Sequence, residues 1–204
     1  ESLDKILREY GPQPEERVLD WAKQLCDILA YLHAQKPPII YRDMKPANVI
    51  LKPEGNLKVI DFGTAREYKE EHTRDTTVLG TRGYASPEHY GLRQTDARSD
   101  IFTLGMTLHH LLTGADPRRT GYRYAPIRQW NPKLSDGLES IIDKCTAMEP
   151  KERYQNCGEL MYDLEHPDLV TRDFKRKQKR RLTLFLAAAA LTLLTLVSGL
   201  ACRA

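Results

Sequence analysis

Paired metal-ligand spacings are missing from this sequence of 204 residues. The cysteines are too widely spaced for a zinc site or a small disulfide scaffold; they are Cys26, Cys145, Cys157 and Cys202. His109 and His110 are adjacent, so on a helix their side chains would point in different directions and could not share a metal. We therefore expect ordinary thiols in a reducing compartment and no metal site built from cysteine or histidine.

Basic residues are not spread along the chain, which argues against a nucleic-acid partner. Residues 172–181 hold seven basic residues and one acidic residue, while the whole chain has a net charge of only +3. Residues 182–202 follow directly and carry no charge. At helical rise this run is just long enough to cross a hydrocarbon core of about 30 Å. We predict a transmembrane helix over 182–202, preceded by a basic juxtamembrane linker over 167–181.

A buried core helix and a signal peptide are the alternatives for this apolar run. A core helix of this length would normally have a polar stripe, and a signal peptide stands at the N-terminus. Arg203 is the only basic residue after the run, which predicts a single-pass cell-membrane protein with residues 1–181 cytoplasmic and the C-terminus outside. The basic linker is interpreted as a topology signal; a docking site for anionic lipid of the bilayer is the alternative.

The remainder of the sequence predicts a mainly helical lobe. A short helix is expected at the start, stopped by Gly11, and a long core helix from Pro14 to near Gln35. Further helices are expected where apolar residues recur at helical spacing, around residues 101–112, from Asp136 and from Asn156.

A small β-hairpin is predicted after the first core helix. Short apolar runs over 48–51 and 57–60 are joined by a turn at 53–56. Residues 64–81 have no periodicity, which suggests a loop, and residues 116–133 show no amphipathic helix.

Four polar side chains flank the predicted hairpin. Asp43, Lys45 and Asn48 precede it, and Asp61 follows it at the start of Asp61-Phe62-Gly63. Because a tight hairpin returns its ends to one place, we expect these side chains to converge. Two carboxylates, an amide oxygen and a lysine suit phosphoryl transfer, in which Mg²⁺ takes oxygen ligands and a cation stabilises developing charge.

The run Tyr41-Arg42-Asp43-Met44-Lys45-Pro46-Ala47-Asn48, with Asp61-Phe62-Gly63 at this spacing, resembles the eukaryotic-type protein kinases, in the form found in bacterial membrane Ser/Thr kinases. The likeness covers residues 1 to about 166 and implies the C-terminal lobe of the α+β kinase fold. It implies that Asp43 accepts the substrate hydroxyl proton and that Lys45 neutralises the γ-phosphate of ATP. Asn48 and Asp61 would hold Mg²⁺, with Mn²⁺ as an alternative, so that Lys45, Asn48 and Asp61 all contact the nucleotide.

Further segments resemble this family in the expected order. Gly80-Thr81 resembles the substrate-binding loop that closes an activation segment, and Ser86-Pro87-Glu88 follows it. Asp100 resembles the buried aspartate that braces the catalytic loop. Arg153 resembles the arginine that pairs with Glu88, a structural ion pair.

By the same resemblance, Arg42 would receive a phosphate placed on the activation loop. The candidate acceptors are Thr73, Thr76 and Thr77, and bidentate guanidinium–phosphate pairing is the physical reason to consider them. The alternative is that all three are solvated loop threonines.

The chain also departs from the family pattern. Tyr41 stands where histidine is usual, Ser86 where alanine is usual, and no residue corresponds to the glycine-rich loop and strand lysine of the ATP-clamping N-terminal lobe. We expect this chain to be a piece of an ATP-dependent Ser/Thr protein kinase that acts on protein substrates. We also expect the chain to be inactive alone. The alternative is a non-catalytic, membrane-tethered scaffold module; dimerisation through the kinase lobe or the membrane segment is left open.

Overall fold

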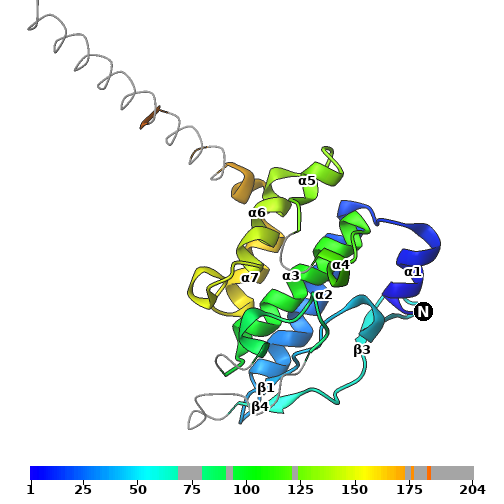
Figure 1. Cartoon of the computed structure of the whole chain (residues 1–204), viewed down its shortest axis with the longest axis vertical. Helices are drawn as coiled ribbons and strands as arrows, with labels where there is room; N and C mark the ends of the chain where they lie inside the picture. Colours follow the sequence, from blue (N-terminus) through cyan, green and yellow to red (C-terminus); the bar gives the residue numbers. More distant parts are fainter. Residues whose placement is uncertain (69–79, 91–93, 121–123, 173–175, 177–182, 185–204) are drawn as a thin grey trace, which may run out of the picture.

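The computed structural model describes residues 1–68, 80–90, 94–120, 124–172, 176 and 183–184. Within this part of the chain, α helices predominate and the only sheets are two small antiparallel pairs of strands. The mainly helical architecture therefore agrees with the sequence-based expectation. Figure 1 shows the helices gathered into one body, with the strands at its edge.

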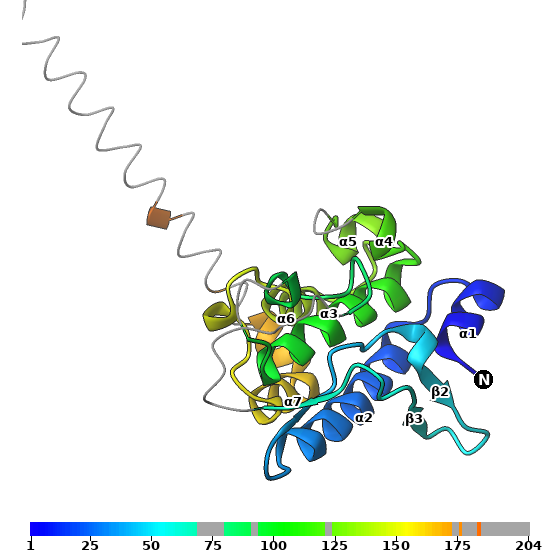
Figure 2. The same ribbon diagram turned by 60° about the horizontal axis from the view of Figure 1, so that its bottom comes forward.

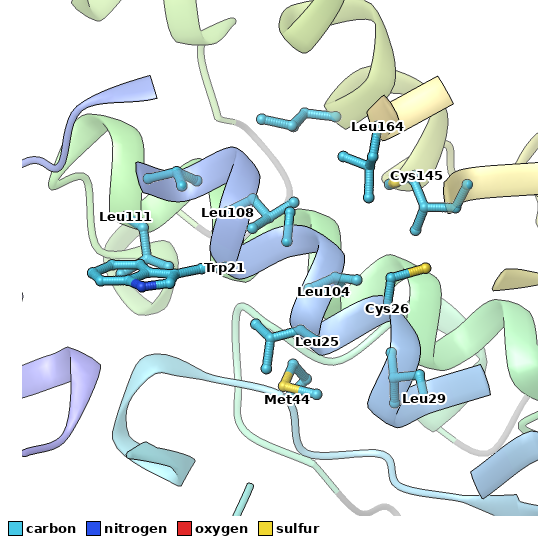
Figure 3. Close-up of a cluster of buried hydrophobic side chains, with 14 of the residues drawn as sticks. Trp21, Leu25, Cys26, Leu29, Met44, Leu104, Leu108, Leu111, Cys145 and Leu164 are labelled. Carbon is cyan, nitrogen blue, oxygen red and sulfur yellow. The ribbon is translucent and has the colours of Figure 1, made fainter. Parts of the chain in front are cut away.

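Two helices form the centre of this body. Helix α2 (Glu15–His33) begins directly after Pro14, and helix α3 (Ala97–Thr113) is capped by Asp96, whose side chain accepts from the Arg98 amide. Helix α3 ends at Gly114, where φ is +70°. Apolar side chains of α2 and α3 face each other in the core, among them Trp21, Leu25, Leu104, Leu108 and Leu111 (Figure 3).

Helix α3 is buried on nearly every side, since all its residues from Ser99 to Thr113 are buried. A helix that lacks a solvent-facing stripe must lie inside a fold. Gly105 permits a close approach here, because a Cβ atom at this position would lie 2.6 Å from Cys145 Cβ at the end of α6 (Asp136–Cys145). The central position predicted for this helix follows from its burial.

The remaining helices pack around α2 and α3. Helix α7 (Cys157–Glu165) lies along α2 and is capped by Asn156, as the sequence suggested, whereas α6 is capped by Ser135 instead of opening with Asp136 as its cap. Two short helices, α4 (Pro117–Thr120) and α5 (Ile127–Trp130), occupy the region without an amphipathic helix. Three 3-10 turns complete the described helical elements: η1 (Pro46–Asn48), η2 (Pro87–Tyr90) and η3 (Pro150–Glu152).

Helix α1 (Leu3–Tyr10) and the predicted hairpin lie together at one edge (Figure 2). The hairpin consists of β2 (Val49–Leu51) and β3 (Leu57–Val59), with Val49 opposite Val59. Glu1 and Leu51 exchange backbone hydrogen bonds of 2.7 and 2.9 Å, which attach the start of the chain to the hairpin.

A second strand pair was not predicted. Strand β4 (Arg66–Glu67) lies within the segment expected to be a loop and pairs antiparallel with β1 (Ile39–Ile40). The Tyr68 amide extends this contact by donating to the Pro38 carbonyl at 2.7 Å. The loop prediction was therefore wrong for these residues, and the pairing anchors the chain just beyond the Asp61 segment.

The prediction of a transmembrane helix over 182–202, and with it the single-pass membrane location, is corrected by the structure. Among the described residues, no helix combines the length and the apolar character needed to cross a bilayer. Apart from residues 183–184, the predicted span lies outside the described residues, as does most of the basic run 172–181.

Candidate active site

Asp43 lies at the centre of a buried group of polar side chains in the loop between β1 and η1. Asp43 as a residue is only 6% exposed. Asp43 Oδ2 accepts hydrogen bonds from Lys45 Nζ (2.7 Å) and Asn48 Nδ2 (2.9 Å). Asp43 Oδ1 accepts from the Thr81 hydroxyl (2.6 Å) and the Thr81 amide (3.2 Å). Both oxygens of the carboxylate are thus held in place by neighbours.

Lys45 links the two sides of this group. Its Nζ atom donates to Asp43 Oδ2 and also to Thr81 Oγ1, the latter at 2.7 Å. Thr81 is far from the other residues in sequence, yet its side chain completes the cluster. The sequence placed Thr81 in a substrate-binding loop but gave no indication of its direct contact with Asp43, since that contact depends on how the chain returns.

Asp61 lies at the far end of the hairpin, where the Ile60 amide donates to the Asn48 carbonyl at 2.9 Å. Its φ is +64°, an unusual backbone conformation for a residue other than glycine, and its side chain is exposed. Asp61 Oδ1 accepts from the Gly63 amide at 3.1 Å. The hairpin therefore connects the Asn48 backbone to the residue that precedes Asp61.

The oxygens of Asn48 and Asp61 suit a hard divalent cation. The Asn48 amide nitrogen donates to Asp43, which leaves Asn48 Oδ1 directed elsewhere as an acceptor. Within the described residues, no group of three or more histidine, cysteine, aspartate or glutamate side chains forms a metal cage. One carboxylate and one amide oxygen nevertheless fit Mg²⁺, which usually keeps several waters and takes further oxygens from substrate phosphates.

Tyr41 connects the loop around Asp43 with the segment around Asp61. Its hydroxyl donates to the Ile60 carbonyl at 2.6 Å, and its ring meets Phe62 edge-on with 5.3 Å between the ring centroids. Burial raises the pKa of the Tyr41 phenol, and the nearby charges of Asp43 and Asp61 raise it further. The hydroxyl therefore remains a proton donor, and Tyr41 has a positioning role that the sequence did not reveal.

Asp100 of helix α3 supports the loop around Asp43 by accepting hydrogen bonds from its backbone. Its carboxylate is fully buried and accepts from the Tyr41 amide (2.9 Å) and the Arg42 amide (2.7 Å). His33, at the end of α2, lies 2.8 Å from Asp100 through its Nε2 atom. The sequence predicted that Asp100 braces the loop, but it did not identify His33 as a partner of Asp100. His33 has no sequence feature that distinguishes it except its position at the end of a helix.

Arg42 is buried beside this loop with φ of +69°. Its Nε atom donates to the Thr64 carbonyl at 2.6 Å, so it joins the loop to the chain just after Asp61. The candidate phosphate acceptors Thr73, Thr76 and Thr77 all lie outside the described residues.

Glu88 and Arg153 form a buried ion pair away from Asp43. Arg153 donates through two nitrogens to the two carboxylate oxygens of Glu88, at 2.6 and 3.0 Å, and Ser99 donates to the same carboxylate at 2.7 Å. Burial alone would raise the pKa of Glu88, but the hydrogen bonds and charge of Arg153 outweigh it and lower this pKa to about 2. The pair joins the turn η2 to the segment before α7.

Comparisons with known proteins identify the family of this chain. The family model described as "Protein kinase domain" matches residues 1–167. Serine/threonine-protein kinase PknB of Mycobacterium leprae is 32% identical over 176 residues, covering 80% of this chain and 28% of that protein. PknB of Mycobacterium tuberculosis is 33% identical over 178 residues, with the same coverage, and PrkC of Bacillus subtilis is 31% identical over 195 residues, covering 90% of this chain and 29% of PrkC.

This chain spans less than a third of the length of these relatives. Protein kinases in general use ATP with a divalent cation and act on protein substrates. The family match covers most of the chain, and all three relatives are named as serine/threonine kinases. The chain belongs to the protein kinase family.

Proposed function

We propose that this chain carries the catalytic half of an ATP-dependent protein serine/threonine kinase. The observation that supports the proposal best is the cluster of Asp43, Lys45, Asn48 and Thr81, in which three neighbours fix one buried carboxylate. Such pre-organisation suits a step that depends on positioning and on stabilising charge.

Asp43 is the proposed acceptor of the proton from the substrate hydroxyl. Lys45 donates a hydrogen bond to this carboxylate and orients it, and the same ammonium group lies where it can offset the charge of a transferred phosphoryl group. Thr81, which donates to Asp43 through both its hydroxyl and its amide, holds the substrate-binding loop against the base. A substrate hydroxyl would approach Asp43 from this side.

Asn48 Oδ1 and the Asp61 carboxylate are the proposed ligands of Mg²⁺, with Mn²⁺ as an alternative. Bound there, the cation would neutralise charge on the phosphates of ATP. Tyr41 and the hairpin hold the two ligands at a fixed separation, through the Ile60 carbonyl and the Ile60 amide respectively.

We also propose that this chain alone transfers phosphate at a negligible rate. In the family that it belongs to, the adenine and the outer phosphates are also held by a second lobe, to which no residue of 1–166 corresponds. Phe62, next to Asp61, is 49% exposed. A covering lobe would bury it.

The test is Asp43→Asn in the protein as expressed from its own gene. Removal of the proposed base is expected to lower kcat for phosphorylation of a threonine peptide by about 10²- to 10⁴-fold. Transfer of radioactive phosphate from ATP in the presence of Mg²⁺ measures the effect. Asp27→Asn, at an exposed position of α2, is the matched control and should leave kcat unchanged.

Equal incorporation by wild-type protein and Asp43→Asn would contradict the assignment of the base. If neither protein transfers phosphate, while both unfold at the same urea concentration, a scaffold that binds partners without chemistry becomes the better description.

A further inference from the structure

The segment 80–85 forms a fixed corner directly beside Asp43. The Thr81 carbonyl accepts from the Tyr84 amide at 3.0 Å, which closes a tight turn with Arg82 and Gly83 as its central residues. Gly83 has φ of +89°, as the third residue of such turns requires in one common class. Arg82 therefore stands at the outer corner of a turn whose first residue contacts the proposed base.

The other end of this turn is fixed against the helical body. A Cβ atom at Gly83 would lie 2.3 Å from the carbonyl oxygen of Pro117, so the turn touches the start of α4. The Tyr84 hydroxyl lies 2.5 Å from His110 Nδ1 on α3. Because residues 83–85 are buried, Arg82 is the one side chain of 81–85 that is exposed to solvent.

Most ionic groups around this corner already have partners. Asp116 pairs with Arg118 at 2.7 Å, and Asp4 pairs with Arg8 at 3.0 Å. Arg82 and Arg119, both exposed, have no carboxylate within ion-pair distance in the described part of the chain. The corner therefore presents positive charge that the described residues leave uncompensated.

A cleft continues from this corner across the surface. It has a volume of about 610 Å³ and lies between α1, the end of α3 and α4; its lining includes Arg8, His110, Asp116, Arg119 and Trp130. His110 contacts Tyr84, which connects the cleft to the turn. Trp130 is 53% exposed and provides an apolar surface beside Arg119. An extended polypeptide lying over the turn could continue into this cleft.

We propose that Arg82, assisted by Arg119, selects protein substrates that carry aspartate or glutamate residues next to the accepted hydroxyl. This inference rests on the proposed function, since it names the class of substrate for the site at Asp43. A carboxylate beside the acceptor would meet Arg82, for which the described residues supply no ion-pair partner, and a lysine or arginine at the same place would be repelled. Arg82 acts here on specificity and does not touch the transferred group.

The test compares three threonine peptides with the protein expressed from its own gene. The peptides are identical except that the residues flanking the threonine are aspartate, alanine or lysine. Wild-type protein should show the highest kcat/KM for the acidic peptide and the lowest for the basic one. Arg82→Ala should reduce the ratio of kcat/KM for the acidic peptide to that for the neutral peptide by about 5-fold, as expected for the loss of one exposed ion pair.

Three variants sharpen this comparison. Arg82→Lys keeps the charge and should retain most of the preference, whereas Arg119→Ala should lower it by a smaller factor. Lys52→Ala removes an exposed cation in the hairpin turn and should change nothing. Higher ionic strength should lower the ratio of kcat/KM for the acidic peptide to kcat/KM for the neutral peptide, because salt screens the charge of Arg82.

The outcomes separate the two proposals. Equal kcat/KM for acidic and neutral peptides in wild-type protein, with Asp43→Asn still inactive, would overturn the role of Arg82 and leave the kinase function intact. A preference for acidic peptides that persists in Arg82→Ala would also overturn it. If the wild-type protein phosphorylates none of the three peptides, that result would contradict both the proposed function and this inference.

Discussion

The buried ion pair between Glu88 and Arg153 contributes to the stability of the fold, because Arg153 makes several further contacts. Arg153 is 2% exposed, and besides Glu88 it donates to the carbonyls of Ala147, Arg98 and Met148. Its guanidinium also lies 4.8 Å from the centre of the Phe102 ring. Arginine is always charged in proteins, and these contacts keep Arg153 buried. Loss of its carboxylate partner would therefore leave a buried cation without compensation.

The pair predicts a defined pH dependence of stability. The pKa of Glu88 is lowered to about 2 in the folded protein from an ordinary value of 4.5, so its contribution is complete above about pH 4.5 and is lost as the pH falls towards 2. That contribution amounts to roughly 3 kcal/mol at most. Urea unfolding between pH 7 and 3 should show the decline.

Glu88→Gln tests the assignment. At pH 7 it should lower the free energy of unfolding by about 3 to 5 kcal/mol, because Arg153 is left buried without its counter-charge. Between pH 4.5 and 3 the variant should lose less stability than wild-type protein. Glu54→Gln, in the exposed hairpin turn, is the control. An unchanged slope with pH in Glu88→Gln would contradict the prediction.

At this scale, spacing along the chain was enough to predict that Asp43, Lys45 and Asn48 lie close together, because they belong to one short loop. Thr81 and His33 were different. Their contacts with Asp43 and Asp100 join segments far apart in sequence, and neither residue carries a local pattern that distinguishes it from other threonines and histidines. Long-range partners depend on the path of the chain, which periodicity does not encode.

At the scale of elements, helix α3 determines where the other parts lie. Its Asp100 side chain contacts the loop around Asp43, its His110 side chain contacts the turn at 81–84, and its Thr107 hydroxyl donates to the Met44 carbonyl at 2.9 Å. Its opposite side meets α6 at Gly105. A small residue at this crossing lets the two helices approach closely, so the position of α3 depends on the absence of a side chain there.

Gly105→Ala is expected to destabilise the protein despite the higher helix propensity of alanine. The new Cβ would lie 2.6 Å from Cys145 Cβ and 2.7 Å from Thr146 Cγ2, so the end of α6 must move. Overpacking of this kind costs about 1 to 3 kcal/mol, to be measured by urea unfolding. The control, Asp27→Ala at an exposed helical position, should be within about 0.5 kcal/mol of wild type. A more stable Gly105→Ala variant would show that the crossing has room.

Long elements were predicted well and short ones were not. Helix α2 has an apolar pattern long enough to identify, and the hairpin was identified from two short apolar runs joined by a turn; both lie where expected. Strands β1 and β4 have two residues each, and α4 and α5 have four, which is too few for any periodicity to emerge. The cap of α6 was misplaced by one residue because Ser135 and Asp136 are both good N-caps.

At the scale of the whole molecule, one continuous apolar core joins α1, α2, α3, α6, α7 and the hairpin. Figure 3 shows side chains of this core meeting around α2, including Met44 from the loop that carries Asp43. A core shared by these elements favours cooperative unfolding, in which the site and the helices are lost together.

The two tryptophans of the chain allow a test of this cooperativity. Trp21 is 3% exposed in the core, whereas Trp130 is 53% exposed, so Trp130→Phe leaves a single buried reporter. Its fluorescence and the far-ultraviolet circular dichroism should change with the same urea midpoint. Two separate midpoints would show that the core around α2 and the remaining helices unfold independently.

The support that Asp100 gives to the loop around Asp43 also has a consequence for synthesis on the ribosome. The chain that carries Asp43, Lys45, Asn48 and Asp61 is made before Asp100, and Arg153 is made later still. A nascent chain can therefore hold every proposed reacting group while lacking the helix that fixes them. The order of translation delays the assembled site until most of the lobe has emerged.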